Sequence, residues 1–276
     1  MKTKLLPALS ALALVLGLAA LGLAGGEIEI KGSTTVLPLM QKVAEAYMTA
    51  YPGSNISLSG GGSSEGAKAL IDGTCDIAML SRDLKDEEIK AASAKHRPPR
   101  QIVVAYDCIV PVVHPSNPVK NLSVAQLLGI YSGRITDWKD VGGKPGRIVV
   151  VSRDSSSGTY DCWEQKIMHS GGQKSRVFAG ASIQASNGAV AQVVSKNGLA
   201  IGYVGLGYLN RELKAVSVNG VFGSARTAMD KTFPIARSLI LATPGEPRGE
   251  PKAMIDFMLS AKGQKLVVEA GFVPLR

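Results

Sequence analysis

The stretch "SRDSSSGT", Ser152 to Thr159, places an arginine and a dense group of hydroxyl side chains directly after a run of valines. Three shorter stretches have the same character: "GSTT" at 32–35, "GGGSS" at 60–64 and "LSRD" at 80–83. Hydroxyl groups, the N–H groups of helix starts and arginine are the donors that suit a small, dehydrated oxyanion. One serine would suffice to cap a helix, so the surplus in the first stretch favours anion binding.

Each of these stretches lies between an expected strand and an expected helix. The strands are 27–31, 55–59, 76–80 and 147–151. Apolar side chains at helical spacing follow the first of them, and we expect Ser33 or Thr34 to cap that helix. Alternating strands and helices predict a parallel α/β sheet, which binds ligands beyond the carboxyl ends of its strands. If the four stretches converge there, they form a cage of N–H and O–H donors with arginine.

The rest of the chain continues the same pattern. "QIVVAYDCIVPVVHP" is expected to form one long apolar strand, and "FPIARSLILAT" another. A helix capped at Ser186 or Asn187 should precede a strand rich in glycine. Two short helices are expected near the C-terminus, around 251–260 and 262–270.

The first 25 residues differ from the rest. Lys2 and Lys4 form a basic start, Leu5 to Leu23 is apolar apart from Ser10, and "GLAGGE" supplies small residues. This is the pattern of a signal peptide for secretion, so we expect residues 1–25 to be removed and the protein to be periplasmic. An uncleaved N-terminal anchor is the alternative, because the apolar run is long enough to span a bilayer.

Composition narrows the function classes. The chain has 276 residues, of which 45% are hydrophobic and 19% charged, which is typical of a globular protein. Its net charge of +9 favours anionic partners in general. Lysine and arginine are scattered, however, and aromatic residues make up only 5%, so no nucleic-acid-binding surface is expected.

Cysteines and histidines do not form a recognisable metal site. Cys75, Cys108 and Cys162 have no CxxC spacing, and His96, His114 and His169 are far apart. One cysteine pair could be bridged, with Cys75 and Cys108 favoured, or all three could be buried free thiols. We expect no metal and no cofactor.

One alternative is enzymatic. "GSSEG", Gly62 to Gly66, matches G-x-S-x-G and would make Ser64 the nucleophile of a serine hydrolase. The histidines that could serve it lie in poor contexts, and no oxyanion loop precedes the serine. The sequence has neither a P-loop nor a G-x-G-x-x-G motif. We therefore expect a protein without catalytic residues.

The motifs "KGSTTVLPL", "LSGGGSSEG", "CDIAMLSRDL", "SRDSSSGTYD" and "SNGAVAQVVSKNGLAIGYVGLGY" resemble those of the phosphate-binding proteins of bacterial high-affinity phosphate ABC importers. The resemblance runs in order from about Ile28 to the C-terminus. It implies a periplasmic-binding-protein type II fold, with two α/β domains, a ligand cleft and two crossover strands. Domain one would comprise 27–107 and 238–276, and domain two 108–237.

The resemblance also implies a function. The protein would act as a monomer that captures inorganic phosphate in the cleft and delivers it to the membrane permease of an ABC importer. Carried over motif by motif, the phosphate-binding residues would be Ser33, Thr34, Thr35, Ser63, Ser81, Arg82, Arg153, Ser157, Gly158 and Thr159.

Two positions depart from the family pattern. Some members carry an aspartate where Ser81 stands and an acidic residue where Ser155 stands. A receptor for another oxyanion, such as sulfate or molybdate, is therefore the alternative in the same class. If phosphate is preferred over sulfate, a carboxylate must reach the site from elsewhere, and Asp154 is the first candidate, followed by Asp83.

Overall fold

The computed structural model describes residues 27–172 and 174–275. The elements in chain order are β1 (Glu27–Gly32), α1 (Leu37–Ala50), β2 (Asn55–Gly60), α2 (Ser63–Asp72), β3 (Ile77–Leu80), α3 (Asp86–Ala94), β4 (Pro99–Val113), β5 (Asn121–Leu122), α4 (Val124–Tyr131), η1 (Trp138–Val141), β6 (Val149–Arg153), α5 (Gly158–Trp163), η2 (Glu164–Met168), β7 (Ser182–Gln184), α6 (Asn187–Ser195), β8 (Ala200–Gly205), η3 (Leu206–Tyr208), β9 (Lys214–Ala215), β10 (Ser217–Val218), α7 (Ala225–Met229), β11 (Ala236–Pro244), α8 (Gly249–Leu259) and α9 (Ala261–Glu269).

Within these residues, nine strands form a mixed sheet in the order β2-β1-β3-β11-β4-β8-β6-β7, with β9 paired to β4. Strand β1 pairs in parallel with β2 and β3, and β6 pairs in parallel with β7 and β8. Every residue of β3 and β8 is buried, as expected for strands covered on both faces. The α/β class predicted from the sequence is confirmed.

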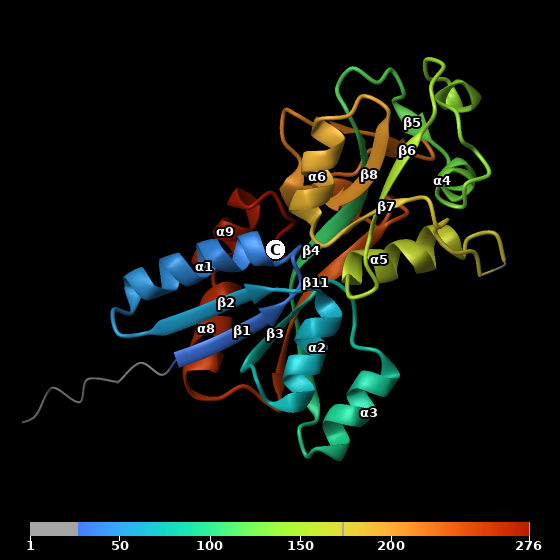
Figure 1. Cartoon of the computed structure of the whole chain (residues 1–276). Helices are drawn as coiled ribbons and strands as arrows, with labels where there is room; N and C mark the ends of the chain where they lie inside the picture. The colour runs from blue at the N-terminus through green and yellow to red at the C-terminus, as the bar shows by residue number, and fades with distance from the viewer. Residues whose placement is uncertain (1–26, 173, 276) are drawn as a thin grey trace, which may run out of the picture.

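Strands β4 and β11 connect the two parallel groups (Figure 1). The first part of β4, Pro99–Cys108, pairs antiparallel with β11, and its second part, Ile109–Val113, pairs with β8. Strand β11 pairs with β3 on its other side. The two long apolar segments expected to form strands, "QIVVAYDCIVPVVHP" and "FPIARSLILAT", therefore make up most of the central strands of the sheet.

The hydrophobic cores fall into two sets. One set joins β1, β3 and the first part of β4 with α1, α2, α8 and α9, and we call this part the first lobe. The other joins the second part of β4 with β6, β8 and the helices α4 to α6, and we call it the second lobe. The residue limits of the two domains given above stay a prediction.

Helix α1 begins later than expected. Its N-cap is Val36, which makes no side-chain cap, so the prediction of a cap at Ser33 or Thr34 was wrong. Residues 33–36 instead form a turn in which Ser33 Oγ accepts the Thr35 N–H at 3.1 Å and the Ser33 carbonyl accepts the Leu37 N–H. Proline in the first helical turn costs no hydrogen bond. The cap at Ser186 is confirmed, since its side chain accepts the Ala189 N–H.

The three cysteines are free and buried. Cys75 and Cys108 belong to different hydrophobic cores, so the structure does not form the disulfide that the sequence left open. Burial raises the pKa of both thiols to about 12, which keeps them protonated and unreactive. The expected signal peptide lies outside the described residues, and among the residues described no helix is long and apolar enough to cross a membrane.

Candidate functional site

The four hydroxyl-rich turns meet where the two lobes touch. Thr35 Oγ1 lies 2.9 Å from Thr159 Oγ1, which belongs to the first turn of α5 in the second lobe. Ser63 Oγ lies 3.3 Å from Ser81 Oγ and accepts the Ser81 N–H at 3.0 Å. All ten predicted site residues are buried: Ser33, Thr34, Thr35, Ser63, Ser81, Arg82, Arg153, Ser157, Gly158 and Thr159.

Gly158 brings α5 against the serines of the first lobe. A Cβ atom placed on it would lie 2.2 Å from Ser63 Oγ and 2.8 Å from Ser81 Oγ. Only a glycine permits this approach. Ser157 caps α5 by accepting the Tyr160 N–H at 3.2 Å, so its side chain serves the helix.

Hydrogen bonds to backbone carbonyl groups also hold the two lobes together beside the site. The Ser64 N–H donates to the Ser156 carbonyl at 3.0 Å, and Ser156 Oγ donates to the Gly61 carbonyl at 2.9 Å. The Tyr208 hydroxyl donates to the Thr34 carbonyl. The structure is therefore a closed arrangement, in which polar groups of the two lobes contact one another directly.

Arg153 has a donor with no partner. Its Nε and Nη2 donate to the Gln184 and Ala185 carbonyls, each at 2.9 Å. Nη1 is buried and makes no hydrogen bond with any described residue. Burial lowers the pKa of this guanidinium, and buried donors are almost always paired in native proteins. The free N–H groups of Nη1 therefore indicate an acceptor that the protein itself does not supply.

Asp154 stands beside this arginine. Its Oδ1 accepts the Ser156 N–H at 2.8 Å and also contacts the Ser156 hydroxyl. Its Oδ2 is buried without a hydrogen-bond partner among the described residues and lies 3.6 Å from Arg153 Nη2. Asp83, the second candidate carboxylate, is exposed. Of the two, only Asp154 has a free acceptor oxygen close to the arginine.

Arg82 has no donor left for a ligand. Its Nε donates to Asp161 Oδ2 at 2.6 Å, and its two terminal nitrogens donate to both Glu88 oxygens at 2.8 Å. The remaining N–H groups reach the Asp83 carbonyl and Ser64 Oγ. These contacts use all five N–H groups of a guanidinium, so the geometry gives no support to the prediction that Arg82 binds the ligand directly.

The same contact bears on the hydrolase alternative. Ser64 Oγ accepts from Arg82 Nη2 at 3.1 Å, whereas a nucleophilic serine needs a base within hydrogen-bond reach. His114 Nδ1 instead contacts Ser116. Among the described residues, no group of three or more His, Cys, Asp or Glu could hold a metal ion.

Sequence reasoning missed three residues of the site. Asn187 Nδ2 donates to Thr34 Oγ1 at 3.2 Å and to Thr35 Oγ1 at 3.0 Å. Arg237 donates to Thr35 Oγ1 and Thr159 Oγ1, and it pairs with Asp107 at 2.7 Å. The sequence signal for Arg237 and Asp107 was a single charged residue in each of two long apolar strands. Burying a charge is costly unless an opposite charge pairs with it, so the two residues are natural partners.

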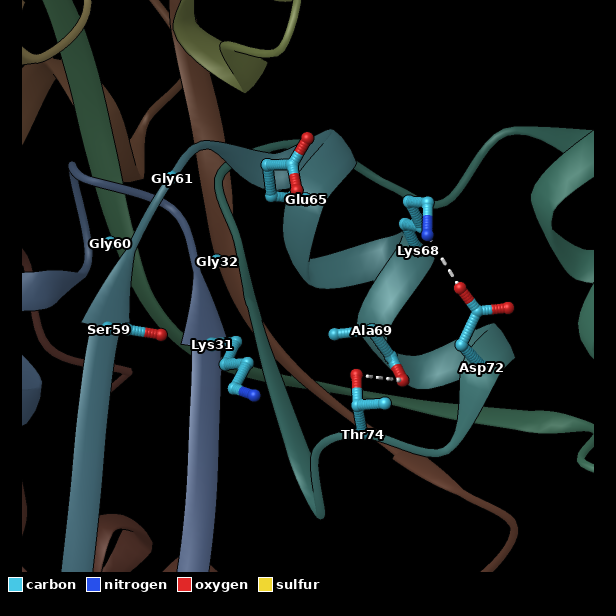
Figure 2. Close-up of a pocket in the computed structure, with 10 residues that line it drawn as sticks. All are labelled: Lys31, Gly32, Ser59, Gly60, Gly61, Glu65, Lys68, Ala69, Asp72 and Thr74. Carbon is cyan, nitrogen blue, oxygen red and sulfur yellow. Dashed lines mark hydrogen bonds and ion pairs between the residues drawn. The ribbon is translucent and has the colours of Figure 1, made fainter.

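A groove of about 350 Å³ lies behind the glycine turn that ends β2 (Figure 2). Lys31, Lys68 and Asp72 line it, and Lys68 pairs with Asp72 at 2.7 Å. Ser63, Ser81, Arg153 and Thr159 do not line it. The candidate site is therefore the cluster of buried polar residues where the lobes meet and not this open groove.

Comparison with known proteins places the chain in a family. Residues 19–262 match the model of a PBP superfamily domain. The phosphate-binding protein PstS of Borreliella burgdorferi is 31% identical over 259 residues, which cover 90% of each chain. PstS of Staphylococcus aureus strain USA300 is 32% identical over 90% of this chain and 78% of its own length.

Solved structures of phosphate-binding proteins are also similar to this chain over most of its length. A phosphate ABC transporter substrate-binding protein with bound phosphate, from Clostridium perfringens, has a TM-score of 0.84 at 34% identity and covers 91% of this chain and 100% of its own. An ABC-type phosphate transport receptor from Vibrio cholerae has a TM-score of 0.73 at 32% identity, covering 89% and 99%. The chain therefore belongs to the PBP superfamily and, within it, to the family of the phosphate-binding proteins PstS.

Proposed function

We propose that this protein binds inorganic phosphate between its two lobes and delivers it, as a monomer in the periplasm, to the membrane permease of an ABC importer. The relatives named above support the ligand and the transport role. The two-domain division at 27–107 with 238–276 and at 108–237 belongs to the same proposal, and it makes the interface between lobes a cleft that opens and closes. The protein carries out no catalysis.

The buried, unpaired Nη1 of Arg153 is the observation that carries the proposal. The hydroxyls of Ser63 and Ser81 lie against the first turn of α5, which carries the Thr159 hydroxyl. An oxyanion accepts from all of these donors at once, and a charge-assisted hydrogen bond from the guanidinium strengthens its binding. A neutral ligand would not offer a charged acceptor to the buried N–H groups of Nη1.

Isothermal titration of the protein with phosphate, arsenate, sulfate and molybdate tests the proposal. We expect phosphate to bind most tightly. Arg153→Ala should weaken phosphate binding by about 2–5 kcal/mol, because it removes one partner of a buried charge pair. The exposed Arg147→Ala is the matched control and should leave affinity unchanged.

Two results would overturn the proposal. A protein that binds sulfate or molybdate more tightly than phosphate is a receptor for another oxyanion. If Arg153→Ala and Arg147→Ala bind phosphate equally well, the site does not include Arg153.

A further inference from the structure

Arg237 occupies the middle of the site but was given no role by the sequence. It lies on β11 directly opposite Asp107 on β4, and both residues are buried. Arg237 Nη2 and Nε donate to Asp107 Oδ2 at 2.7 and 3.0 Å, while Asp107 Oδ1 accepts the Leu206 N–H at 2.8 Å. The carboxylate is thus held from two sides, and it fixes the position of the guanidinium.

The other N–H groups of Arg237 reach both lobes. Nη1 donates to Thr159 Oγ1 at 3.0 Å and to the Ser81 carbonyl at 3.3 Å, and Nη2 donates to Thr35 Oγ1 at 3.2 Å. All five N–H groups are therefore engaged within the protein. Arg237 has none left for an anion, so any part that it takes in binding must be exerted through the threonines.

The direction of each hydrogen bond can be worked out from Asn187. Its Oδ1 accepts the Gly205 N–H at 3.4 Å, so its Nδ2 is the atom that faces Thr35 Oγ1 at 3.0 Å. A hydroxyl oxygen accepts two hydrogen bonds and donates one. Thr35 Oγ1 already accepts from Asn187 and from Arg237, so its own hydrogen is left for Thr159 Oγ1, 2.9 Å away.

The same reasoning then applies to Thr159. Its Oγ1 accepts from Arg237 Nη1 and from the Thr35 hydroxyl, which fills both acceptor positions. Among the described residues these are its two hydrogen-bond neighbours, so its own hydrogen has no protein acceptor. The side chain is 1% exposed, and a buried donor of this kind needs a partner.

We propose that Arg237 is a positioning residue that, together with Asn187, fixes the Thr159 hydroxyl as a hydrogen-bond donor aimed at the bound anion. The inference rests on the proposed function. The phosphate oxygen facing Thr159 must then be an unprotonated acceptor, so the proton of bound hydrogen phosphate lies on a different oxygen. Arg237 should therefore strengthen the binding of phosphate and sulfate equally and take no part in distinguishing between them.

A double-mutant cycle between Arg237 and Thr159, measured by titration with phosphate, tests this role. Thr159→Val should lower affinity by about tenfold or more in the parent protein, since a hydrogen bond to a charged acceptor is lost. Thr159→Ser keeps the hydroxyl and should bind more tightly than Thr159→Val. Arg237→Lys keeps a positive charge beside Asp107, but the lysine cannot reach both Thr35 and Thr159. Acceptor positions on the threonine hydroxyls become free, so the hydroxyls are able to rotate.

In the Arg237→Lys background, we expect Thr159→Val to cost less than about threefold, and the preference of Thr159→Ser over Thr159→Val to shrink with it. Arg237→Lys alone should weaken phosphate and sulfate by the same factor. If Arg237→Lys does not fold, the neutral pair Arg237→Gln with Asp107→Asn replaces it in the cycle, because it leaves no buried charge uncompensated.

Equal costs of Thr159→Val in both backgrounds would show that Thr159 donates without help from Arg237 and would overturn the inference. A change in the ratio of phosphate to sulfate affinity in Arg237→Lys would also overturn it. A parent protein that binds no phosphate would instead overturn the proposed function itself.

Discussion

The close approach of Gly158 to Ser63 and Ser81 makes this position sensitive to a single methyl group. We expect Gly158→Ala to weaken phosphate binding by about tenfold or more, because the added Cβ would lie 2.2 Å from Ser63 Oγ and force the lobes apart. Gly198→Ala is the control, since its Cβ would meet Ser116 Oγ at an ordinary 3.5 Å. Titration of both variants with phosphate makes the comparison. Equal affinities would mean that α5 does not approach Ser63 this closely when the anion is bound.

Asp154 is the residue that we expect to distinguish phosphate from sulfate. Sulfate has the size and charge of hydrogen phosphate but no proton, so an acceptor facing one oxygen repels sulfate alone. Asp154 Oδ2 is a buried acceptor without a hydrogen-bond partner among the described residues. Asp154→Asn turns the group into a donor and should lower the phosphate preference at least about tenfold.

Asp83→Asn provides the matched control for this prediction. Asp83 is exposed, so its replacement should leave the preference unchanged. Competition titrations of phosphate against sulfate decide the matter. Unchanged ratios in both variants would leave Ser81 as the acceptor for the phosphate proton.

The sequence predicted the hydroxyl donors and Arg153 because each lies in a short local motif at the end of a strand. The partners of Arg237 could not be predicted in the same way. Asp107 is 130 positions away along the chain, and only the pairing of β4 with β11 brings the two together. The ion pair of Arg82 could not be predicted for the same reason, because its carboxylate partner Asp161 comes from the other lobe.

At the scale of elements, the turn before α3 is tied to α5 by an ion pair between the lobes. Arg82 Nε and Lys85 Nζ approach the two oxygens of Asp161 at 2.6 and 3.3 Å, and Glu88 on α3 holds the other side of the Arg82 guanidinium. The side chains of Arg82 and Asp161 are only 7% and 10% exposed. The pair forms only where the lobes meet, so it should favour the closed arrangement.

We therefore expect Asp161→Asn to weaken phosphate binding through closure, without touching the anion. Loss of this charged hydrogen bond should cost about 1–3 kcal/mol of affinity, since Glu88 still compensates Arg82. Titration with phosphate measures the loss, and Asp72→Asn, which removes an exposed ion pair, should show none. Parental affinity in Asp161→Asn would mean that the pair is equally formed in the open protein.

The order of strands and helices was predictable because the spacing of apolar residues is a local signal. The start of α1 was not, since Ser33 and Thr34 look like caps but lie in a turn before the helix. The sequence also gave no sign that α5 continues into the π-helical turn η2, Glu164–Met168. That turn depends on packing, because Ile167 and Met168 are buried in the second lobe.

At the scale of the whole molecule, donors from both lobes must face one anion, so phosphate should favour the closed form. Saturating phosphate should lower the radius of gyration in solution scattering and raise the melting temperature. At a free concentration of 100 Kd, the gain in unfolding free energy should be about 2.7 kcal/mol. Arg153→Ala should show both effects weakened at the same concentration, with a gain in unfolding free energy below about 1 kcal/mol, which controls for general effects of salt. Stabilisation of the parent without compaction would place the whole site on one lobe.

The first lobe is built from two stretches that lie far apart in the sequence, and this arrangement limits when its core can form. Met254, Met258 and Val267 of α8 and α9 share one core with Ile28 and Ile30 of β1, and Val273 bridges to Tyr106 on β4. A growing polypeptide therefore cannot finish this core until residues 254–273 have been made. For a protein that we propose to be exported, this delay favours transfer across the membrane before folding. It also makes loss of residues 249–273 more damaging than the short helices α8 and α9 suggest.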